Sequence, residues 1–220
     1  MNAGDGIVLG LSRGRLLQQS LDLLAETGLQ VHTPREREML HPTNAEGVQV
    51  LIGRGIDIMT LVARGAAHAG IVGSDLLLEH EPDNLHQMLD LRLGQCRIVT
   101  AALERPDAGA RAAGGKMRVA AKLSHIAARH YSDAGRQVEI ISLRGGVETA
   151  PLLGLCEEIV DIVDTGRTLR ENGLVEQDVI ARVSARLIIN KAALVVHGAR
   201  LNPLIADLRT IVAERTGAGD

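Results

Sequence analysis

A short polar string in the second half of the chain, Thr165 to Thr168 (T-G-R-T), has the residue types of a phosphate-binding loop. An apolar run from Ile159 to Asp164 precedes it and indicates a buried strand, and the stretch from Leu169 to Asn172 indicates a helix. Glycine lets the backbone turn tightly so that successive N–H groups converge, and threonine hydroxyls and a helix N-terminus add further donors. We therefore predict an anion-binding loop between this strand and this helix.

Two carboxylates lie on the strand that leads into this loop, Asp161 and Asp164. Carboxylates at the mouth of a phosphate site accept hydrogen bonds from sugar hydroxyls or hold a metal ion that accompanies a phosphate. A phosphorylated sugar is thus the first hypothesis for the ligand. A T-G pair also occurs in purely structural loops, so the neighbouring motifs must decide between the two interpretations.

The same order of buried strand, glycine turn and helix occurs twice more in the first half of the chain. Ile7 to Leu11 is followed by Ser12 to Arg15 and a leucine-rich helix, and Ala69 to Asp75 leads into a helix that Asp75 is expected to cap. Such turns belong to α/β sheets that bind ligands at the carboxyl ends of their strands.

A further strand, helix and strand follow at residues 118–121, 123–134 and 138–142, after a Gly- and Ala-rich segment at 104–116. The simplest architecture is two hinged α/β lobes, resembling the type II periplasmic-binding-protein architecture, with the active site in the cleft between them. We expect lobe I to comprise residues 1–95 plus 181–220 and lobe II residues 96–180. Lobe I would be the nucleotide side, and lobe II would carry the anion-binding loop.

The composition argues against nucleic-acid binding. The chain of 220 residues has a net charge of -3 and lacks Phe and Trp, so that Tyr131 is its one aromatic residue. A nucleic-acid-binding protein would normally carry a basic surplus and aromatic platforms for stacking bases. We therefore expect no nucleic-acid partner.

The cysteines and the apolar runs indicate the cellular compartment. Cys96 and Cys156 are far apart and form no C-x-x-C pair, which favours neither a zinc site nor a disulfide framework. The N-terminal residues lack the pattern of a signal peptide, and no stretch approaches the ~18 uninterrupted apolar residues of a membrane span. We expect a cytoplasmic protein with no membrane partner.

Four motifs in order along the chain resemble the ATP phosphoribosyltransferase family, the first enzyme of histidine biosynthesis. They are L-S-R-G-R at 11–15, A-G-I-V-G-S-D-L-L-L-E at 69–79, D-L-R-L-G-Q-C-R-I-V-T-A at 90–101, and the segment 148–169. The length is similar to that of the short form, which lacks a C-terminal regulatory domain. The resemblance implies a homodimer that assembles with a histidyl-tRNA-synthetase-like regulatory subunit into a hetero-oligomer.

The resemblance also implies roles for individual residues. Arg15 and Arg37 would be catalytic, with Arg37 approaching the leaving pyrophosphate. ATP would contact Ser12, Arg13, Gly14, Arg15 and Asp75. Phosphoribosyl pyrophosphate would bind to the loop and its flanking acids, which are Glu148, Asp161, Asp164, Thr165, Gly166, Arg167, Thr168 and Leu169.

The implied reaction is attack by a ring nitrogen of the adenine of ATP on the anomeric carbon of phosphoribosyl pyrophosphate. The nitrogen already has a lone pair, so no general base is needed, and catalysis would rest on alignment and on neutralising the leaving pyrophosphate. Mg²⁺ would be carried with the substrates, and we expect no metal site made by the protein alone. The alternative hypothesis is a non-catalytic two-lobed anion- or solute-binding module.

Overall fold

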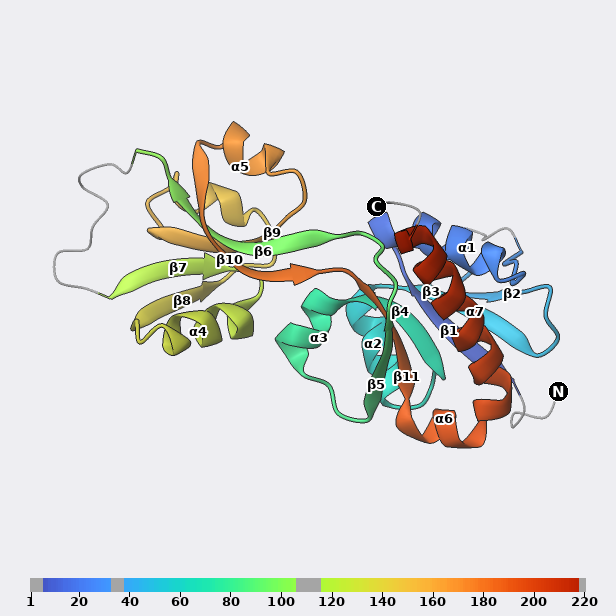
Figure 1. Ribbon diagram of the computed structural model, residues 1–220. Coiled ribbons are helices and arrows are strands. Elements are labelled where there is room, and N and C mark those ends of the chain that lie inside the picture. The colour runs from blue at the N-terminus through green and yellow to red at the C-terminus, as the bar shows by residue number, and fades with distance from the viewer. Residues whose placement is uncertain (1–5, 33–37, 106–115, 218–220) are drawn as a thin grey trace. The chain divides into compact units, whose positions relative to one another are not determined.

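The computed structural model describes residues 6–32, 38–105 and 116–217. The chain divides into two compact units, the first made of residues 1–77, 81–94 and 184–220 and the second of residues 78–80 and 95–183. Each unit has a β-sheet of its own flanked by helices (Figure 1). The expected α/β class with two lobes is confirmed.

The sheet of the first unit has the strand order β2-β3-β1-β4-β11-β5. Its centre is parallel, and its remaining strands run antiparallel to their neighbours. The parallel strands are β1 (Ile7–Ser12), β3 (Val48–Gly53) and β4 (Ala69–Gly73), and the others are β2 (Leu40–Pro42), β5 (Leu85–Asp90) and β11 (Ala185–Asn190). The parallel strands carry near-continuous apolar runs because helices cover both of their faces.

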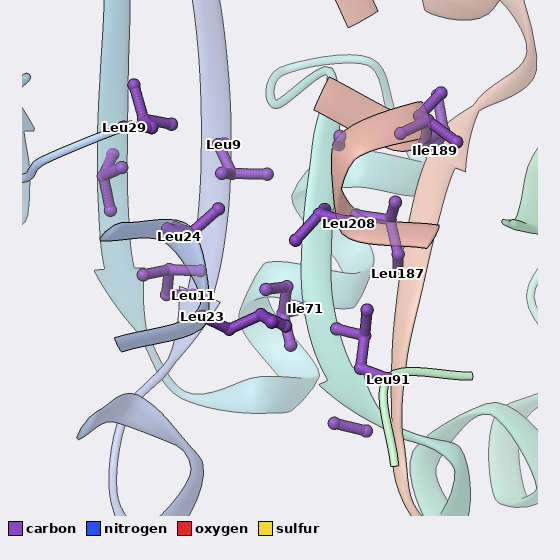
Figure 2. Close-up of a cluster of buried hydrophobic side chains, with 14 of the residues drawn as sticks. Leu9, Leu11, Leu23, Leu24, Leu29, Ile71, Leu91, Leu187, Ile189 and Leu208 are labelled. Atoms are coloured by element: carbon purple, nitrogen blue, oxygen red, sulfur yellow. The ribbon is translucent and has the colours of Figure 1, made fainter. Parts of the chain in front are cut away.

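Successive side chains of each strand point to opposite faces of the sheet, so the core of this unit has two layers. Leu9 and Leu11 of β1 face α1 and α7, as Figure 2 shows with their partners Leu23, Leu24 and Leu208. The opposite face packs against α2 and α3. The helices of this unit are α1 (Arg15–Glu26), α2 (Gly55–Ala63), α3 (Ser74–His80), α6 (Lys191–Val196) and α7 (Gly198–Gly217), and the last turn of α3 belongs to the second unit.

The start of the last helix differs from the sequence pattern. Proline favours the first helical position, which predicts a helix beginning at Pro203. The helix α7 instead begins at Gly198, with Pro203 inside it. Leu201 and Ile205 are both buried in the core of the first unit, so packing holds the turn that precedes the proline in helical form.

The sheet of the second unit has the order β10-β6-β9-β7-β8. The strands β7, β8 and β9 are parallel, and β6 runs antiparallel between β9 and β10. The predicted strand, helix and strand unit is confirmed as β7, α4 and β8. The elements are β6 (Cys96–Leu103), β7 (Met117–Ala121), α4 (Ser124–Asp133), β8 (Val138–Ser142), the short helix η1 (Val147–Thr149), β9 (Glu158–Val163), α5 (Arg167–Glu171) and β10 (Leu174–Val183).

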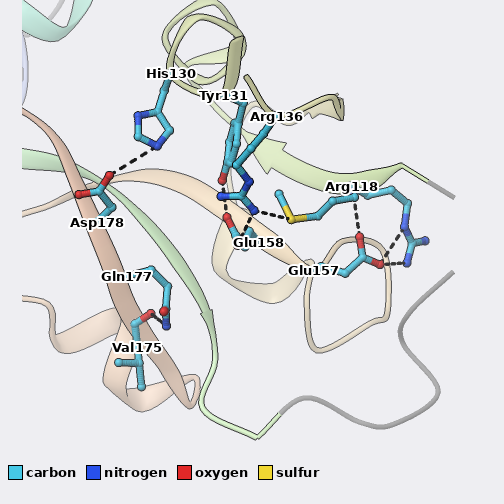
Figure 3. Close-up of polar contacts among 10 residues, drawn as sticks. Arg118, His130, Tyr131, Arg136, Glu157, Glu158, Val175, Gln177 and Asp178 are labelled. Atoms are coloured by element: carbon cyan, nitrogen blue, oxygen red, sulfur yellow. Dashed lines mark hydrogen bonds and ion pairs between the residues drawn. The ribbon is translucent and has the colours of Figure 1, made fainter. Parts of the chain in front are cut away.

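The two faces of this sheet have different coverings. The helix α4 covers one face, where the buried Tyr131 donates its hydroxyl to Glu158 and lies beneath the guanidinium of Arg136, 5.0 Å from the ring centroid (Figure 3). Burial and the Glu158 carboxylate raise the pKa of Tyr131, which therefore stays protonated. The other face is covered by the segments around η1 and α5, and Ile159 and Val163 of β9 pack there. Since side chains alternate along a strand, Asp161 lies on this second face.

None of the helices in the described ranges is both long enough and apolar enough to cross a membrane.

Candidate functional site

A pocket of about 270 Å³ lies in the second unit where β9 ends and α5 begins. Its walls come from η1, from the end of β9 and from the loop that follows, so one short stretch of chain builds most of it. The lining residues are Glu148, Asp161, Ile162, Val163, Asp164, Thr165, Gly166, Arg167, Thr168 and Leu169. The structure thus brings together every residue that the sequence assigns to phosphoribosyl pyrophosphate.

The backbone of the loop turns at Gly166, which is buried and has φ 73° and ψ 9°. This left-handed conformation reverses the chain within one residue and favours glycine. Within the described part of the chain, the N–H groups of Thr165 and Gly166 donate to no protein acceptor, so both remain available to a bound anion. The helix α5 has only five residues, so the loop amides, rather than the dipole of a long helix, provide most of the capacity to bind an anion.

Space as well as conformation favours glycine at position 166. A Cβ atom there would lie 3.0 Å from Nη1 of Arg170 and 3.1 Å from Oε1 of Glu176. Both distances are shorter than ordinary van der Waals contacts, so any larger residue would displace the side chains that lie behind the loop.

Two carboxylates flank the loop. Asp161 is half-buried, and its Oδ1 accepts a hydrogen bond of 2.8 Å from the N–H of Ile162. Burial raises the pKa of Asp161, the charge of Glu148 raises it further, and the backbone hydrogen bond and Lys122 oppose the shift. The two acids are therefore close enough to interact electrostatically, and together they offer acceptors to hydroxyl groups or to a cation.

Ionic groups behind the loop hold its carbonyl oxygens. Arg97 of β6 donates from Nη1 to the carbonyl oxygen of Asp164 at 2.8 Å and forms an ion pair with Glu176 of β10. Arg170 donates from Nη1 to the carbonyl oxygen of Thr165 at 3.1 Å. No local sequence pattern marks Arg97 or Glu176 as functional, although Arg97 lies within the motif at residues 90–101.

The other predicted turn lies in the first unit, between β1 and α1. Ser12 is buried, and its hydroxyl donates to the carbonyl oxygen of Ile71 at 2.9 Å, so it joins β1 to β4. Gly14 has φ 96° and ψ -144°, a conformation open only to glycine, and it is the N-cap of α1. Arg13 and Arg15 are exposed, and Arg15 donates from Nη2 to the carbonyl oxygen of Gly94 at 3.2 Å.

The expectation that Asp75 caps its helix is wrong. The helix α3 begins one residue earlier, at Ser74, with Gly73 as the N-cap and no side-chain capping bond. The carboxylate of Asp75 instead folds back over Gly73, where an added Cβ would lie 2.1 Å from Oδ1. Asp75 therefore lies in the first turn, half-buried, where a negative charge is favourable. The other predicted catalytic arginine, Arg37, lies outside the described residues.

Neither cysteine forms a disulfide, and residues 6–32, 38–105 and 116–217 contain no cluster of three or more His, Cys, Asp or Glu side chains suited to a metal ion.

A loop with free space for an anion and two flanking carboxylates lies in a chain of two α/β units, and comparison with known proteins places this chain among the transferases of the pentosyl-transferring class. The family described as HisG, ATP phosphoribosyltransferase, matches residues 54–210, which is more than half of the chain. The chain belongs to the ATP phosphoribosyltransferase family. It is accordingly an enzyme of the first step of histidine biosynthesis.

Curated relatives and a solved structure agree with this family. The chain is 43% identical over 211 residues to ATP phosphoribosyltransferase of Pseudomonas fluorescens strain Pf0-1, covering 95% of this chain and 98% of the relative. It is 42% identical, with the same coverage, to the enzyme of Pseudomonas putida strain KT2440. The structure of the ATP phosphoribosyl transferase (HisG:HisZ) complex from Thermotoga maritima matches with a TM-score of 0.80 and 29% identity, covering 94% of this chain and 99% of that one.

Proposed function

We propose that this chain transfers the phosphoribosyl group of phosphoribosyl pyrophosphate to a ring nitrogen of the adenine of ATP. The bond from the anomeric carbon to pyrophosphate breaks, a carbon–nitrogen bond forms, and the products are phosphoribosyl-ATP and pyrophosphate. The observation that carries this proposal is the pocket of about 270 Å³ at the end of β9, which combines anion donors with sugar acceptors. That size suits a small phosphorylated sugar.

The 5-phosphate is assigned to the loop from Asp164 to Leu169. The N–H groups of Thr165 and Gly166 and the hydroxyls of Thr165 and Thr168 are donors on one short turn. Converging backbone N–H groups bind phosphate oxygens without requiring a mobile charged side chain. Arg167 lies between Gly166 and Thr168, and its Nε donates to Glu171 at 2.6 Å.

The ribose hydroxyls are assigned to Asp161 and Glu148. A carboxylate accepts two hydrogen bonds from neighbouring hydroxyls, and charge-assisted bonds are stronger than neutral ones. The half-buried position of Asp161 limits competition from water for these bonds. These contacts would fix the orientation of the ring and hence the face of the anomeric carbon that is attacked.

The turn Ser12 to Arg15 is assigned to ATP and to the leaving pyrophosphate. The exposed guanidiniums of Arg13 and Arg15 fit phosphate oxygens in a bidentate manner. The hydroxyl of Ser12 donates to the carbonyl oxygen of Ile71, which shapes the turn and leaves the oxygen able to accept a hydrogen bond from ATP. Asp75 is proposed as an ATP contact and Arg37 as a second cation for pyrophosphate, both from the family resemblance.

Mg²⁺ is proposed to enter with the substrates. It prefers oxygen ligands, keeps several waters and typically takes one or two carboxylates together with substrate phosphates. Glu148 and Asp161 are the donors in the pocket that fit this preference. When bound, the ion would neutralise charge on the departing pyrophosphate.

The assembly is proposed from the solved neighbour, and the compartment is proposed from the cysteines. The solved neighbour from Thermotoga maritima is described as a HisG:HisZ complex, which supports a separate regulatory partner, and we propose that the short-form chain forms a homodimer within such a hetero-oligomer. Neither Cys96 nor Cys156 forms a disulfide, which suits a reducing cytoplasm.

The purified chain should form phosphoribosyl-ATP from ATP and phosphoribosyl pyrophosphate with Mg²⁺, measured with and without a HisZ-type subunit. Isothermal titration with phosphoribosyl pyrophosphate alone should also give binding, because the loop lies within one unit. Binding without product under both conditions would instead support the alternative, a non-catalytic anion-binding module.

Asp161→Asn is expected to weaken binding of phosphoribosyl pyrophosphate and to flatten its pH dependence. The pKa of Asp161 is raised above its ordinary value, mainly by burial. As the pH falls through this raised pKa, the carboxyl becomes protonated and loses a charged acceptor, so the KM for phosphoribosyl pyrophosphate should rise. The measurement is this KM from neutral to mildly acidic pH.

The same shift gives a stability signature. A carboxyl with a raised folded-state pKa stabilises the fold while it is protonated, and this contribution is lost as the pH rises from the ordinary value through the folded pKa. Asp161→Asn should therefore raise the Tm at neutral pH while it weakens substrate binding. Asp178→Asn is the matched control, because Oδ1 of Asp178 accepts the next N–H in the same way, at 2.8 Å, on an exposed strand. A similar KM profile for both variants would remove Asp161 from the ribose site.

A further inference from the structure

An ion pair behind the phosphate loop joins two strands that are distant in sequence. Nε of Arg97 donates to Oε2 of Glu176 at 2.8 Å, and Nη2 donates to Oε1 of the same carboxylate. The residues are separated by 79 positions and lie on the adjacent strands β6 and β10. The carboxylate thus holds the planar guanidinium along one edge, which fixes the direction of the remaining nitrogen.

That remaining nitrogen, Nη1 of Arg97, donates to the carbonyl oxygen of Asp164 at 2.8 Å. Nη1 of Arg170 donates to the carbonyl oxygen of the next residue, Thr165, at 3.1 Å. Two consecutive peptide groups of the loop are therefore held through their oxygens by guanidiniums.

The planarity of the peptide bond converts this attachment into an orientation. In a trans peptide the C=O and the following N–H lie in one plane and point in opposite directions. Holding the oxygen of Asp164 toward Arg97 therefore points the N–H of Thr165 away from Arg97. Holding the oxygen of Thr165 toward Arg170 orients the N–H of Gly166 in the same manner. These are the N–H groups that donate to no acceptor within the described residues.

We propose that Arg97 and Glu176 are positioning residues that aim the loop amides at the 5-phosphate of phosphoribosyl pyrophosphate, which rests on the proposed function of this loop. Arg97 orients the peptide, and Glu176 keeps Arg97 facing the carbonyl oxygen rather than the phosphate itself. Preorganised amides bind an anion without the cost of ordering the loop at the time of binding.

The charge states of the pair agree with this geometry. The hydrogen bond and charge of Arg97 hold the pKa of Glu176 below its usual range. The hydrogen bond and charge of Glu176 raise the pKa of Arg97. Both groups therefore stay ionised throughout the pH range in which the enzyme would work.

A second ion pair in the same unit supplies a matched control. Arg118 donates from Nη2 at 2.5 Å and from Nε at 3.2 Å to Oε1 of Glu157, as Figure 3 shows. The exposed fractions of the side chains are 28% and 29% for Arg97 and Glu176 and 27% and 19% for Arg118 and Glu157. The two pairs are thus similar as ion pairs, but only Arg97 holds a carbonyl oxygen of the phosphate loop.

The test compares Arg97→Gln with Arg118→Gln. Arg97→Gln should raise the KM and the calorimetric Kd for phosphoribosyl pyrophosphate about 10- to 100-fold, the size of effect that a small misplacement of binding groups produces. The KM for ATP should stay at the wild-type value. Arg118→Gln should lower the Tm about as much as Arg97→Gln does, because each variant breaks one ion pair. It should leave the KM values for both substrates unchanged. Glu176→Gln should resemble Arg97→Gln, and the double variant should be no worse than either, because both changes disrupt one unit.

Arg97→Lys provides a graded measurement in case Arg97→Gln fails to fold. Lysine keeps the charge but cannot hold Glu176 and the carbonyl oxygen with one planar group. The KM for phosphoribosyl pyrophosphate should therefore lie between the wild-type and the Arg97→Gln values. Equal effects of the Arg97 and Arg118 variants on this KM, or no effect of Arg97→Lys and Glu176→Gln, would overturn the inference. A wild-type chain that binds no phosphoribosyl pyrophosphate would instead overturn the proposed function.

Discussion

Arg15→Ala is expected to lower kcat about 100- to 1000-fold, the loss typical of removing one group that stabilises transition-state charge. The guanidinium of Arg15 is exposed at the first residue of α1 and is proposed to neutralise the negative charge that grows on pyrophosphate as its bond to the ribose breaks. Because that charge develops during the reaction, the KM values for both substrates should change far less than kcat does. Steady-state kinetics at saturating concentrations of both substrates measure the effect.

Two further variants show whether the loss follows from the charge at this position. Arg15→Lys keeps a cation but not the planar fork, so it should recover part of kcat. Arg209→Ala removes an exposed arginine from α7 in the same unit and should leave kcat unchanged. Wild-type turnover in Arg15→Ala would exclude this arginine from the chemical step.

Gly166→Ala is expected to raise the KM for phosphoribosyl pyrophosphate about 10- to 100-fold, by displacing the loop amides from the phosphate. Alanine at φ 73° costs about 1 kcal/mol or more in backbone strain. Its Cβ would also lie 3.0 Å from Nη1 of Arg170 and 3.1 Å from Oε1 of Glu176. Arg170, which holds the carbonyl oxygen of Thr165, and Glu176, which holds Arg97, must therefore shift, and calorimetric titration with phosphoribosyl pyrophosphate should detect the weaker binding.

Gly173→Ala separates the backbone strain from the displacement of the loop. Gly173 lies just beyond α5, has a similar φ of 67°, and would have nothing within 4 Å of an added Cβ. Both variants should lose stability in thermal unfolding, but only Gly166→Ala should weaken substrate binding. If Gly173→Ala weakens binding as much, the effect comes from general destabilisation and the close approach at Gly166 is not decisive.

Features that depend on residues adjacent in the chain can be predicted from the sequence. The loop from Thr165 to Thr168 was predicted because glycine, hydroxyl residues and a preceding apolar strand lie next to one another in the chain. The strand, helix and strand at β7, α4 and β8 followed from periodicity for the same reason. These features need no knowledge of distant contacts, since the turn and the alternation are local properties of the backbone.

Contacts between residues that are far apart in the chain depend on the three-dimensional fold. Arg97 lies 79 residues from Glu176 and 67 from Asp164, so its role depends on the pairing of β6 with β9 and β10. The hydroxyl of Ser12 donates to the carbonyl oxygen of Ile71 on a neighbouring strand, 59 residues away. Side-chain partners across a sheet are set by which strands pair and in which register, and no local pattern carries that information.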